Sequence, residues 1–528
     1  MEEQKNYAAR DAERNNIPAT ALAGGGGGKP PIYTPRENFP KVRAKGRDLV
    51  LAAVLLLFCF LLWDSLCWAV GIGLGEAVGL FVLLPAALVY LRGRKGRMTG
   101  YAWVCAVLYM LGAGSLALSG DGVLKFFTLC GMVILYLTVF LERLDLRTGN
   151  GLLARLHDLF FAAFSMTFGR LRAGSWALTH SGTEDSAHSK RIRAVGVGLL
   201  CAAPALLILV PLLISSDAAF EGLINRLDWS AAGRGVVALG CGGFFALLHF
   251  SLLYTSDRGP KPMLSAPRKG MEPTAVAAFL GAISAAYILY LVAQFAYFTN
   301  AFRGLLPKDY TVAQYARRGF FEMCAIVAFN LGLIVLALGV CRKEGGRVPG
   351  VVKGMALFLC LFSLALVATA LSKMVLYMNS FGLTRLRVLT SAFMVFLGIV
   401  VIAVGLRLFL KKLPVIQLTV ALGAVLLIGL SLANVDGIVA RYNVDAWKSG
   451  RLDSLDIQTI CELDDGAIPV LAELAADANE TVAKQARDAL KFRSVTEDWR
   501  SWNLITARAS DAMEEFRGDE PSGFAGGK

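Results

Sequence analysis

Four polar stretches between long apolar runs contain arginines and carboxylates, the residue types that bind and orient an anionic group. They are SSDAAFE (215–221), YTVAQYARRGFFE (310–322), YMNSFGLTRLR (377–387) and NVDGIVARYNVD (434–445). An arginine can donate two parallel hydrogen bonds to a phosphate or carboxylate, and a neighbouring acidic side chain can orient it. We therefore predict one ligand site. Its expected residues are Asp217, Tyr315, Arg317, Arg318, Glu322, Arg385, Arg387, Asp436, Arg441 and Asn443.

The same charges also have a structural explanation. Charged side chains at helix ends pair across loops or extend to the membrane surface. A chain that used its charges only in this way would be a membrane scaffold. Both interpretations stay open here, because they require the same residue types at the same places.

A second polar pattern lies within the apolar run 274–298. Its four members follow one another at intervals of three, four and three residues, so they share one helical face. They are Tyr287, Tyr290, Gln294 and Tyr297, and Asn330 lies on the next apolar run. Such a stripe could line a polar cleft in a transporter. The alternative is that these side chains form hydrogen bonds between neighbouring helices.

No catalytic signature accompanies these residues. The sequence has no phosphate-binding glycine loop and no nucleophile elbow. Its ten cysteines include no CxxC pair, and its four histidines are scattered along the chain. We therefore predict no catalytic residue, no cofactor and no metal site, and an enzyme is the less favoured class.

The elements that position these residues are membrane-spanning helices. Of 528 residues, 56% are hydrophobic, and the mean hydropathy is +0.56, too apolar for a soluble chain of this length. A helix needs roughly 20 apolar residues to cross a bilayer. About eleven runs meet this length, which predicts an all-α polytopic bundle. They are 48–70, 72–91, 101–119, 123–141, 194–215, 232–254, 274–298, 319–341, 352–372, 387–409 and 414–434.

The distribution of basic residues predicts the orientation of this bundle. The formal net charge is +13, and the lysines and arginines gather before the first run and in alternate loops thereafter. Cytoplasmic loops are enriched in basic residues in this way, so we expect a cytoplasmic N-terminus and an extracytoplasmic C-terminus. Because the basicity is explained by topology, we predict membrane lipids as partners and no nucleic acid.

The composition divides the chain into six parts. Residues 1–47 are rich in Gly, Pro and charge and are predicted to be a disordered arm. Residues 48–141 and 194–434 contain four and seven predicted spans, and the loop 142–193 between them contains an amphipathic interfacial helix. Residues 435–510 are predicted to be a small helical tail, and 511–528 a disordered end.

Three of the polar motifs, in this order, resemble a known family. The runs are AQYARRGFFEMCAIVAFNLGLIV (313–335), MNSFGLTRLRVLTSAF (378–393) and NVDGIVARYNVD (434–445), followed by LDIQTICELDDGAIPVLAEL (455–474). They look like the bacterial integral membrane proteins of domain-of-unknown-function family 4173, a group related to family 4153. The resemblance covers about residues 190–490. It implies a bacterial inner-membrane protein and assigns no chemical role to any residue.

These observations favour an envelope protein that binds an anionic ligand, a lipid headgroup or a cell-wall precursor, at its outer face. It would act in signalling, assembly or regulation, with another membrane protein as a further expected partner. The alternatives are a transporter that uses the polar cleft and a structural membrane scaffold.

Overall fold

The computed structural model describes a chain of helices. The described residues are 42–67, 71–93, 98–146, 152–180, 187–217, 220–222, 231–258, 270–303, 320–343, 347–410, 412–493 and 498–519. Within them no β-strand forms, and Met271 and Cys341 make an isolated bridge. Most of the predicted N-terminal arm, residues 1–41, lies outside the described residues.

All eleven predicted spans fall on helices. Within the described ranges, nine helices are long and apolar enough to cross a membrane. They are α2 (Gly46–Cys67), α3 (Leu74–Tyr90), α5 (Gly122–Leu144), α11 (Ala231–Arg258), α12 (Pro273–Arg303), α14 (Phe320–Val340), α15 (Gly350–Phe381), α16 (Arg385–Arg407) and α17 (Val415–Leu432). The other two are α4 (Gly100–Leu116), which has 17 residues, and α9 (Ala187–Ser216), which is bent by 53°. The protein is therefore an all-α, multi-pass membrane protein.

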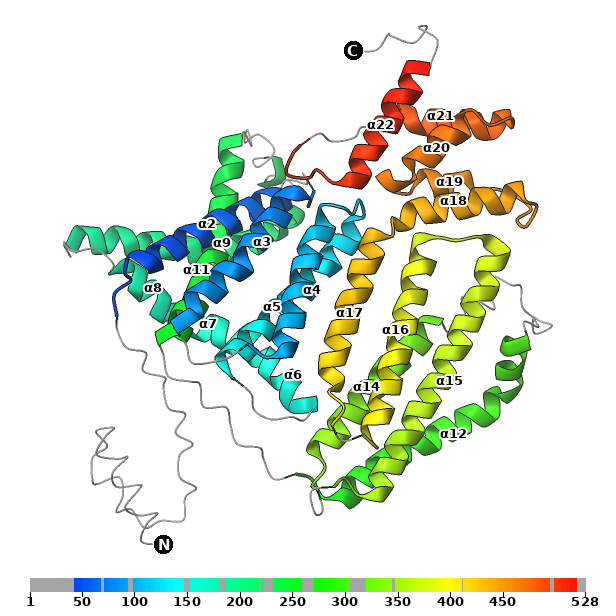
Figure 1. Ribbon diagram of the computed structural model, residues 1–528, viewed down its shortest axis with the longest axis horizontal. Helices are drawn as coiled ribbons and strands as arrows, with labels where there is room; N and C mark the ends of the chain where they lie inside the picture. Colours follow the sequence, from blue (N-terminus) through cyan, green and yellow to red (C-terminus); the bar gives the residue numbers. More distant parts are fainter. Residues whose placement is uncertain are drawn as a thin grey trace. The chain divides into compact units, whose positions relative to one another are not determined.

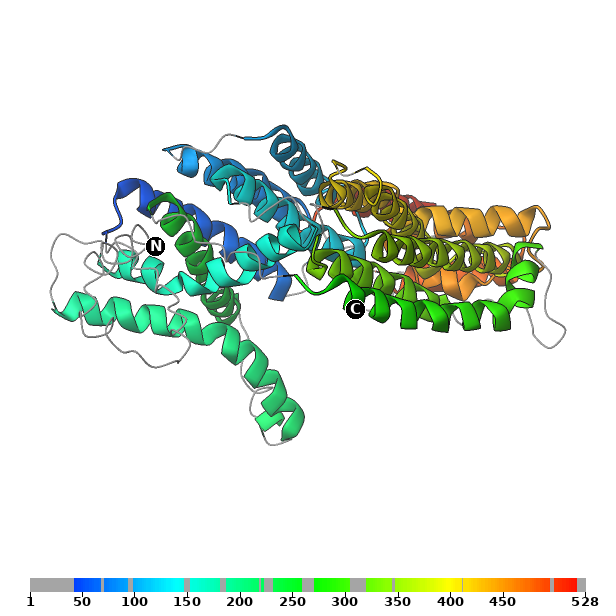
Figure 2. The same cartoon turned by 90° about the horizontal axis from the view of Figure 1, so that it is seen from below.

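The spans pack around two separate apolar cores. The first core is formed by α2 to α5 and α11, with Ala424 and Ile428 of α17. The second is formed by α12, α14, α15 and α16, and Figure 2 shows these four helices running beside one another. Helix α17 contacts α4 and α5 on one side and α16 on the other, as Figure 1 shows. It therefore joins the two sets of spans.

The loop predicted to hold an interfacial helix contains several short helices. They are α6 (Leu152–Phe160), the π-helical turn η3 (Phe161–Met166), α7 (Thr167–Gly169) and α8 (Leu171–Thr179). Helix α8 packs closely on α11, since a Cβ on Gly174 would lie 2.0 Å from the Ser251 hydroxyl oxygen. Phe160, Phe164 and Phe168, four residues apart, are exposed at 70%, 55% and 51%. Such an apolar row fits the interfacial prediction, which stays a prediction.

Beyond α17 the chain forms a C-terminal helical region, defined here as residues 435–519. Its helices are α18 (Val435–Lys448), α19 (Ile457–Cys461), η4 (Asp465–Ala467), α20 (Ile468–Ala475), α21 (Glu480–Lys491) and α22 (Leu504–Asp519). They enclose a third apolar core, to which Leu124 of α5 contributes. Helix α22 continues past residue 510 to Asp519 and buries Met513 in this core, and the predicted division of the chain stays a prediction.

Candidate functional site

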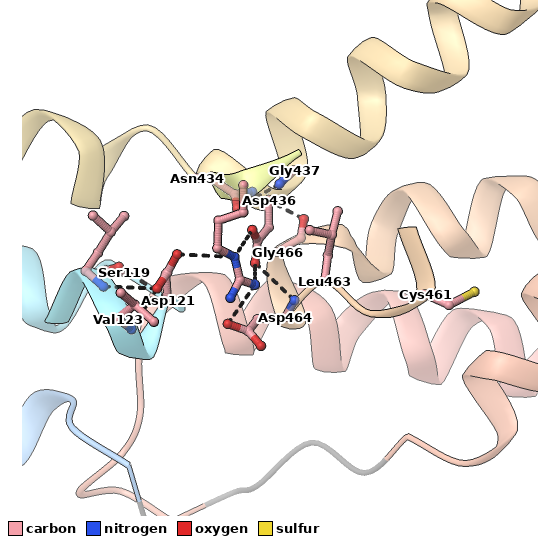
Figure 3. A network of polar contacts seen from close by, with 12 residues as sticks. Ser119, Asp121, Val123, Asn434, Asp436, Gly437, Cys461, Leu463, Asp464 and Gly466 are labelled. Carbon is pink, nitrogen blue, oxygen red and sulfur yellow. Dashed lines mark hydrogen bonds and ion pairs between the residues drawn. The ribbon is translucent and has the colours of Figure 1, made fainter. Parts of the chain in front are cut away.

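The charged groups that sequence analysis selected meet most densely around Arg385, the first residue of α16. Its Nε donates to Oδ1 of Asp436 at 2.7 Å, and its Nη2 donates to the other oxygen of the same carboxylate. The same Nη2 lies 2.9 Å from Oδ2 of Asp464, and Nε lies 3.5 Å from Oδ2 of Asp121. Figure 3 shows Asp121, Asp436 and Asp464 around these ion pairs, which are drawn as dashed lines. We call Arg385, Asp121, Asp436 and Asp464 the Arg385 cluster.

Local structure explains why each carboxylate lies where it does. Asp121 is the N-cap of α5 and accepts hydrogen bonds from the amides of Val123 and Leu124 through Oδ1, which leaves Oδ2 facing Arg385. Asp436 lies in the first turn of α18, where the helix dipole favours a carboxylate, and it also accepts the amide of Asp464 at 3.0 Å. One carboxylate therefore fixes both the arginine and the loop that precedes α20.

The turn into α18 depends on a close approach of two backbones. Asn434 has a positive φ of 46°, a conformation that asparagine tolerates, and its side chain accepts the Gly437 amide at 3.2 Å. A Cβ on Gly437 would lie 2.9 Å from the backbone carbonyl oxygen of Gly466, and a Cβ on Gly466 would lie 2.1 Å from Oδ1 of Asn434, so a side chain at either glycine would displace its neighbour. This contact brings the start of η4 against the start of α18, and with it Asp464 against Arg385.

The electrostatics of the cluster favour internal pairing. A cation at the first position of a helix is opposed by the helix dipole, and the three carboxylates offset this effect at Arg385. Asp121 and Asp436 are 7% and 4% exposed, so their charges require a partner. Burial raises the pKa of Asp464, and Asp436, Asp121 and Asp465 raise it further, while Arg385 lowers it. Three carboxylates against one guanidinium leave the cluster with more negative than positive charge.

Two more predicted site residues belong to the same junction. Asn443 of α18 is 7% exposed; its Oδ1 accepts the Leu383 amide at 2.7 Å and its Nδ2 donates to the Leu383 carbonyl at 2.8 Å. It thereby fixes the turn between α15 and α16, where Gly382 has a φ of +72°. Arg441 pairs through two hydrogen bonds with Glu473 of α20, and both side chains are about half exposed.

Arg387 differs from these arginines in its partners. Its Nη1 donates to the carbonyls of Gly382 at 2.6 Å and Phe381 at 3.2 Å, and its guanidinium lies 4.0 Å from the centre of the Tyr377 ring. Among the described residues no carboxylate lies within ion-pair distance of it. The neighbouring side chains of Phe381 and Leu386 are 50% and 61% exposed. Arg387 is therefore not paired with a described carboxylate and lies beside exposed apolar side chains.

The remaining predicted ligand residues do not join the Arg385 cluster. Asp217 lies at the end of α9 and Glu322 in the first turn of α14, and both are exposed. Tyr315, Arg317 and Arg318 lie outside the described residues. The predicted single site therefore stays a prediction. Of its ten residues, the structure brings five to one junction: Arg385, Arg387, Asp436, Arg441 and Asn443.

Two of the residues predicted to line a polar cleft, Tyr287 and Asn330, belong to a hydrogen-bond chain across three helices. The Tyr287 hydroxyl of α12 donates to Oδ1 of Asn330 at 2.7 Å, and Nδ2 of Asn330 in α14 donates to the Ser363 hydroxyl of α15 at 3.0 Å. Asn330 is 0% exposed. Tyr290 lies edge-on to Phe362, and the side chains of Gln294 and Tyr297 lie outside what the structure describes. These contacts match the alternative, hydrogen bonds between helices, and the cleft stays a prediction.

One ionic cluster was missed by the sequence analysis. Arg258, at the end of α11, donates to both oxygens of Asp48 at 2.8 Å, and the Tyr90 hydroxyl donates to Oδ1 of Asp48 at 2.8 Å. Asp48 is 0% exposed. Arg258 is one of the basic residues in alternate loops that the charge pattern explains by topology alone. The available signal was Asp48, a carboxylate at the start of an apolar run, which requires a partner when buried.

Comparison with known proteins gives one match. No curated protein and no solved structure matches the chain. The family model described as "Domain of unknown function (DUF4153)" matches residues 110–474, more than half of the chain. Every residue of the Arg385 cluster lies within this match. The finer resemblance to family 4173 stays a prediction. The chain belongs to the family DUF4153.

Proposed function

We propose that this integral membrane protein is a scaffold that fixes a helical region to the ends of its membrane spans. The observation that carries this proposal is the Arg385 cluster. Arg385 begins a span of the second core, Asp121 caps a span of the first core, and Asp436 and Asp464 belong to the C-terminal helical region. One guanidinium thus touches both sets of spans and the region that covers them.

The energetics support a structural role for this guanidinium. Removing one partner of a buried ion pair costs roughly 3–5 kcal/mol, because the other charge stays buried and unpaired. Arg385 is 23% exposed and has three acidic partners, so the loss here falls below that range for any single carboxylate. Loss of Arg385 itself leaves three carboxylates close together, which is the more damaging change.

The proposed setting is the bacterial cytoplasmic membrane. The N-terminus would be cytoplasmic and the C-terminal helical region extracytoplasmic, as the basic loops favour. A scaffold in this place would hold another membrane protein or an envelope component against the C-terminal helical region. No catalytic step is part of the proposal.

A second candidate function is binding of an anionic lipid headgroup, and Arg387 is the observation that favours it. Its charge is not neutralised by a described carboxylate, and exposed Phe381 and Leu386 flank it. A phosphate could accept hydrogen bonds from the guanidinium while acyl chains cover the apolar side chains. The excess of negative charge at the Arg385 cluster disfavours an anion there, so we place this candidate at Arg387.

Two variants of neighbouring arginines separate these functions. Arg385→Gln should raise hydrogen–deuterium exchange in α20 and α21 of the protein in nanodiscs, because the C-terminal helical region loses its ionic attachment to the spans. Arg387→Gln should leave that exchange near the wild-type level and should instead weaken retention of phosphatidylglycerol against phosphatidylcholine, measured by native mass spectrometry. Equal exchange in wild type and Arg385→Gln would contradict the scaffold. Unchanged lipid retention in Arg387→Gln would contradict the lipid site alone.

A further inference from the structure

The segment that leads into α22, residues 498–504, ends at the first residue of that helix and lies across the ends of the first spans. The amide of Leu74 donates to the Trp502 carbonyl at 3.0 Å, and the amide of Gly75 donates to the Arg500 carbonyl at 3.1 Å. The amide of Leu504 donates to the Ala117 carbonyl at 3.0 Å. Leu74 begins α3 and Ala117 is the C-cap of α4. The segment is therefore tied by its backbone to the ends of two spans.

Close packing and charge hold the same segment in place. A Cβ on Gly73 would lie 2.4 Å from the backbone carbonyl carbon and oxygen of Ser501, so the two backbones touch. Arg500 pairs with Asp64 in the last part of α2 and with Asp498 at 2.6 Å. The end of a third span, α2, thus contacts the segment. These contacts fix the position of the segment at the ends of the spans.

Two large aromatic side chains of this segment are exposed in the described part of the structure. Trp499 is 60% exposed and Trp502 is 43% exposed. They lie beside the ends of α2, α3 and α4, where a membrane protein passes from hydrocarbon to water. Exposed Leu74 and Leu118, at 36% and 38%, continue the apolar surface at this level. Tryptophan is enriched at this depth because its ring is apolar and its indole N–H needs a polar partner.

We propose that Trp499 and Trp502 insert into the headgroup region of the lipid bilayer, so that residues 498–504 form an interfacial anchor. The bilayer is the occupant that the contacts favour, because the backbone hydrogen bonds fix both rings at span ends. The anchor is independent of the Arg385 cluster and of the scaffold proposal. Its location is outside the residues that match the family model.

Quenching of tryptophan fluorescence by brominated lipid tests this anchor. The full-length chain, with its eight tryptophans, would be placed in nanodiscs of phosphatidylcholine brominated at the 6,7 positions, which quenches near the headgroups. Trp499→Phe/Trp502→Phe should lose part of the quenchable emission. The matched control is Trp447→Phe, because Trp447 packs against the third core in the same region.

The outcome is decisive in either direction. Loss of quenchable emission in the double variant, with none in Trp447→Phe, supports the anchor. Equal quenching in both variants overturns it, and this result includes the case in which a protein partner or a second copy covers the rings. The single variants Trp499→Phe and Trp502→Phe serve if the double variant does not fold, and each should lose part of the same emission.

Discussion

Arg385 and Asp436 are 51 residues apart in the sequence, yet two nitrogens of the guanidinium donate to the two oxygens of the carboxylate. The arginine begins a membrane span, and the aspartate lies in the first turn of the helix that leaves the membrane bundle. This pair, with Asp121 and Asp464 beside it, joins the C-terminal helical region to both sets of spans.

Replacing Asp464 should change how the stability of the folded protein depends on pH, in a direction that its pKa predicts. Burial raises the pKa of Asp464 above its ordinary value, so its charged form is less favourable in the folded state than in the unfolded state. The protonated group contributes stability at low pH, and this contribution is lost as the pH rises through the folded-state pKa. Asp464→Asn should therefore be at least as stable as wild type at pH 7, by at most about 1 kcal/mol because the side chain is 45% exposed.

Thermal unfolding of detergent-solubilised protein between pH 4 and pH 8 would check this. The difference between Asp464→Asn and wild type should shrink as the pH falls. A variant that is less stable than wild type at pH 7 would show that the ion pair with Arg385 outweighs burial.

The exposed ion pair between Arg441 and Glu473 should contribute little to the stability of the fold. The hydrogen bonds from Arg441 lower the pKa of Glu473, so the pair stabilises the fold above the unfolded-state pKa and loses this effect as the pH falls. Since both side chains are about half exposed, Arg441→Gln should cost only about 0.2–1 kcal/mol, and 0.5 M salt should reduce that difference. A larger loss, unaffected by salt in melting experiments, would indicate a ligand or partner at Arg441.

A methyl group at Gly73 should displace the C-terminal segment from α3. The added Cβ would lie within 2.4 Å of the Ser501 backbone, which must then move. Gly73→Ala should speed amide exchange in residues 498–504. The control is Gly122→Ala, since a Cβ at Gly122 meets nothing within 4 Å and a helical alanine is favoured by roughly 0.5–1 kcal/mol. Equal exchange in the two variants would contradict the close contact.

Asn330→Leu distinguishes a hydrogen bond between helices from a transport path. The substitution removes the bonds to Tyr287 and Ser363, each worth about 0.6–2 kcal/mol in a membrane protein. We expect a lower melting temperature and no solute flux in proteoliposomes for either protein. Solute-dependent flux in wild type that disappears in Asn330→Leu, at unchanged stability, would favour the transporter.

Paired reporter fusions test the proposed orientation. Fusions after Pro307, Phe381 and Gly450 should be active with a reporter that works only outside the cytoplasm, and a fusion after Lys412 should be active only with a cytoplasmic fluorescent reporter. The basic residues of alternate loops are the reason for this expectation. A cytoplasmic signal after Gly450 would place the Arg385 cluster on the other side of the membrane.

The membrane spans could be predicted because each is a long run of apolar residues. Each run of about 20 apolar residues became a helix, because apolar length and backbone hydrogen bonding leave a membrane segment few alternatives. The motif around Arg385 and the motif around Asp436 were also predicted to lie on the same side of the membrane. Two spans separate them, so the chain crosses the membrane and comes back between the two motifs. Asn443, selected only as part of a motif, proved to bind the backbone of Leu383.

Specific partners were not predictable, because they depend on which helices pack together. Nothing near Arg258 in the sequence points to Asp48, 210 residues away. Asp464 is the N-cap residue of η4, but its side chain makes no capping hydrogen bond and lies against Arg385. The buried ammonium of Lys125 in α5 donates to the Ile72 carbonyl, 53 residues away in the sequence. Each of these contacts is created by tertiary packing.

A double-mutant cycle between Arg385 and Asp436 tests the scaffold most directly. The free energy of local opening of α20 and α21 would be measured by hydrogen–deuterium exchange in nanodiscs for wild type, Arg385→Gln, Asp436→Asn and the double variant. The proposed attachment predicts an interaction energy above about 1 kcal/mol, with the double variant less destabilised than the two single changes sum to. Additivity within about 0.5 kcal/mol would contradict it, because the two residues would then act independently on the C-terminal helical region.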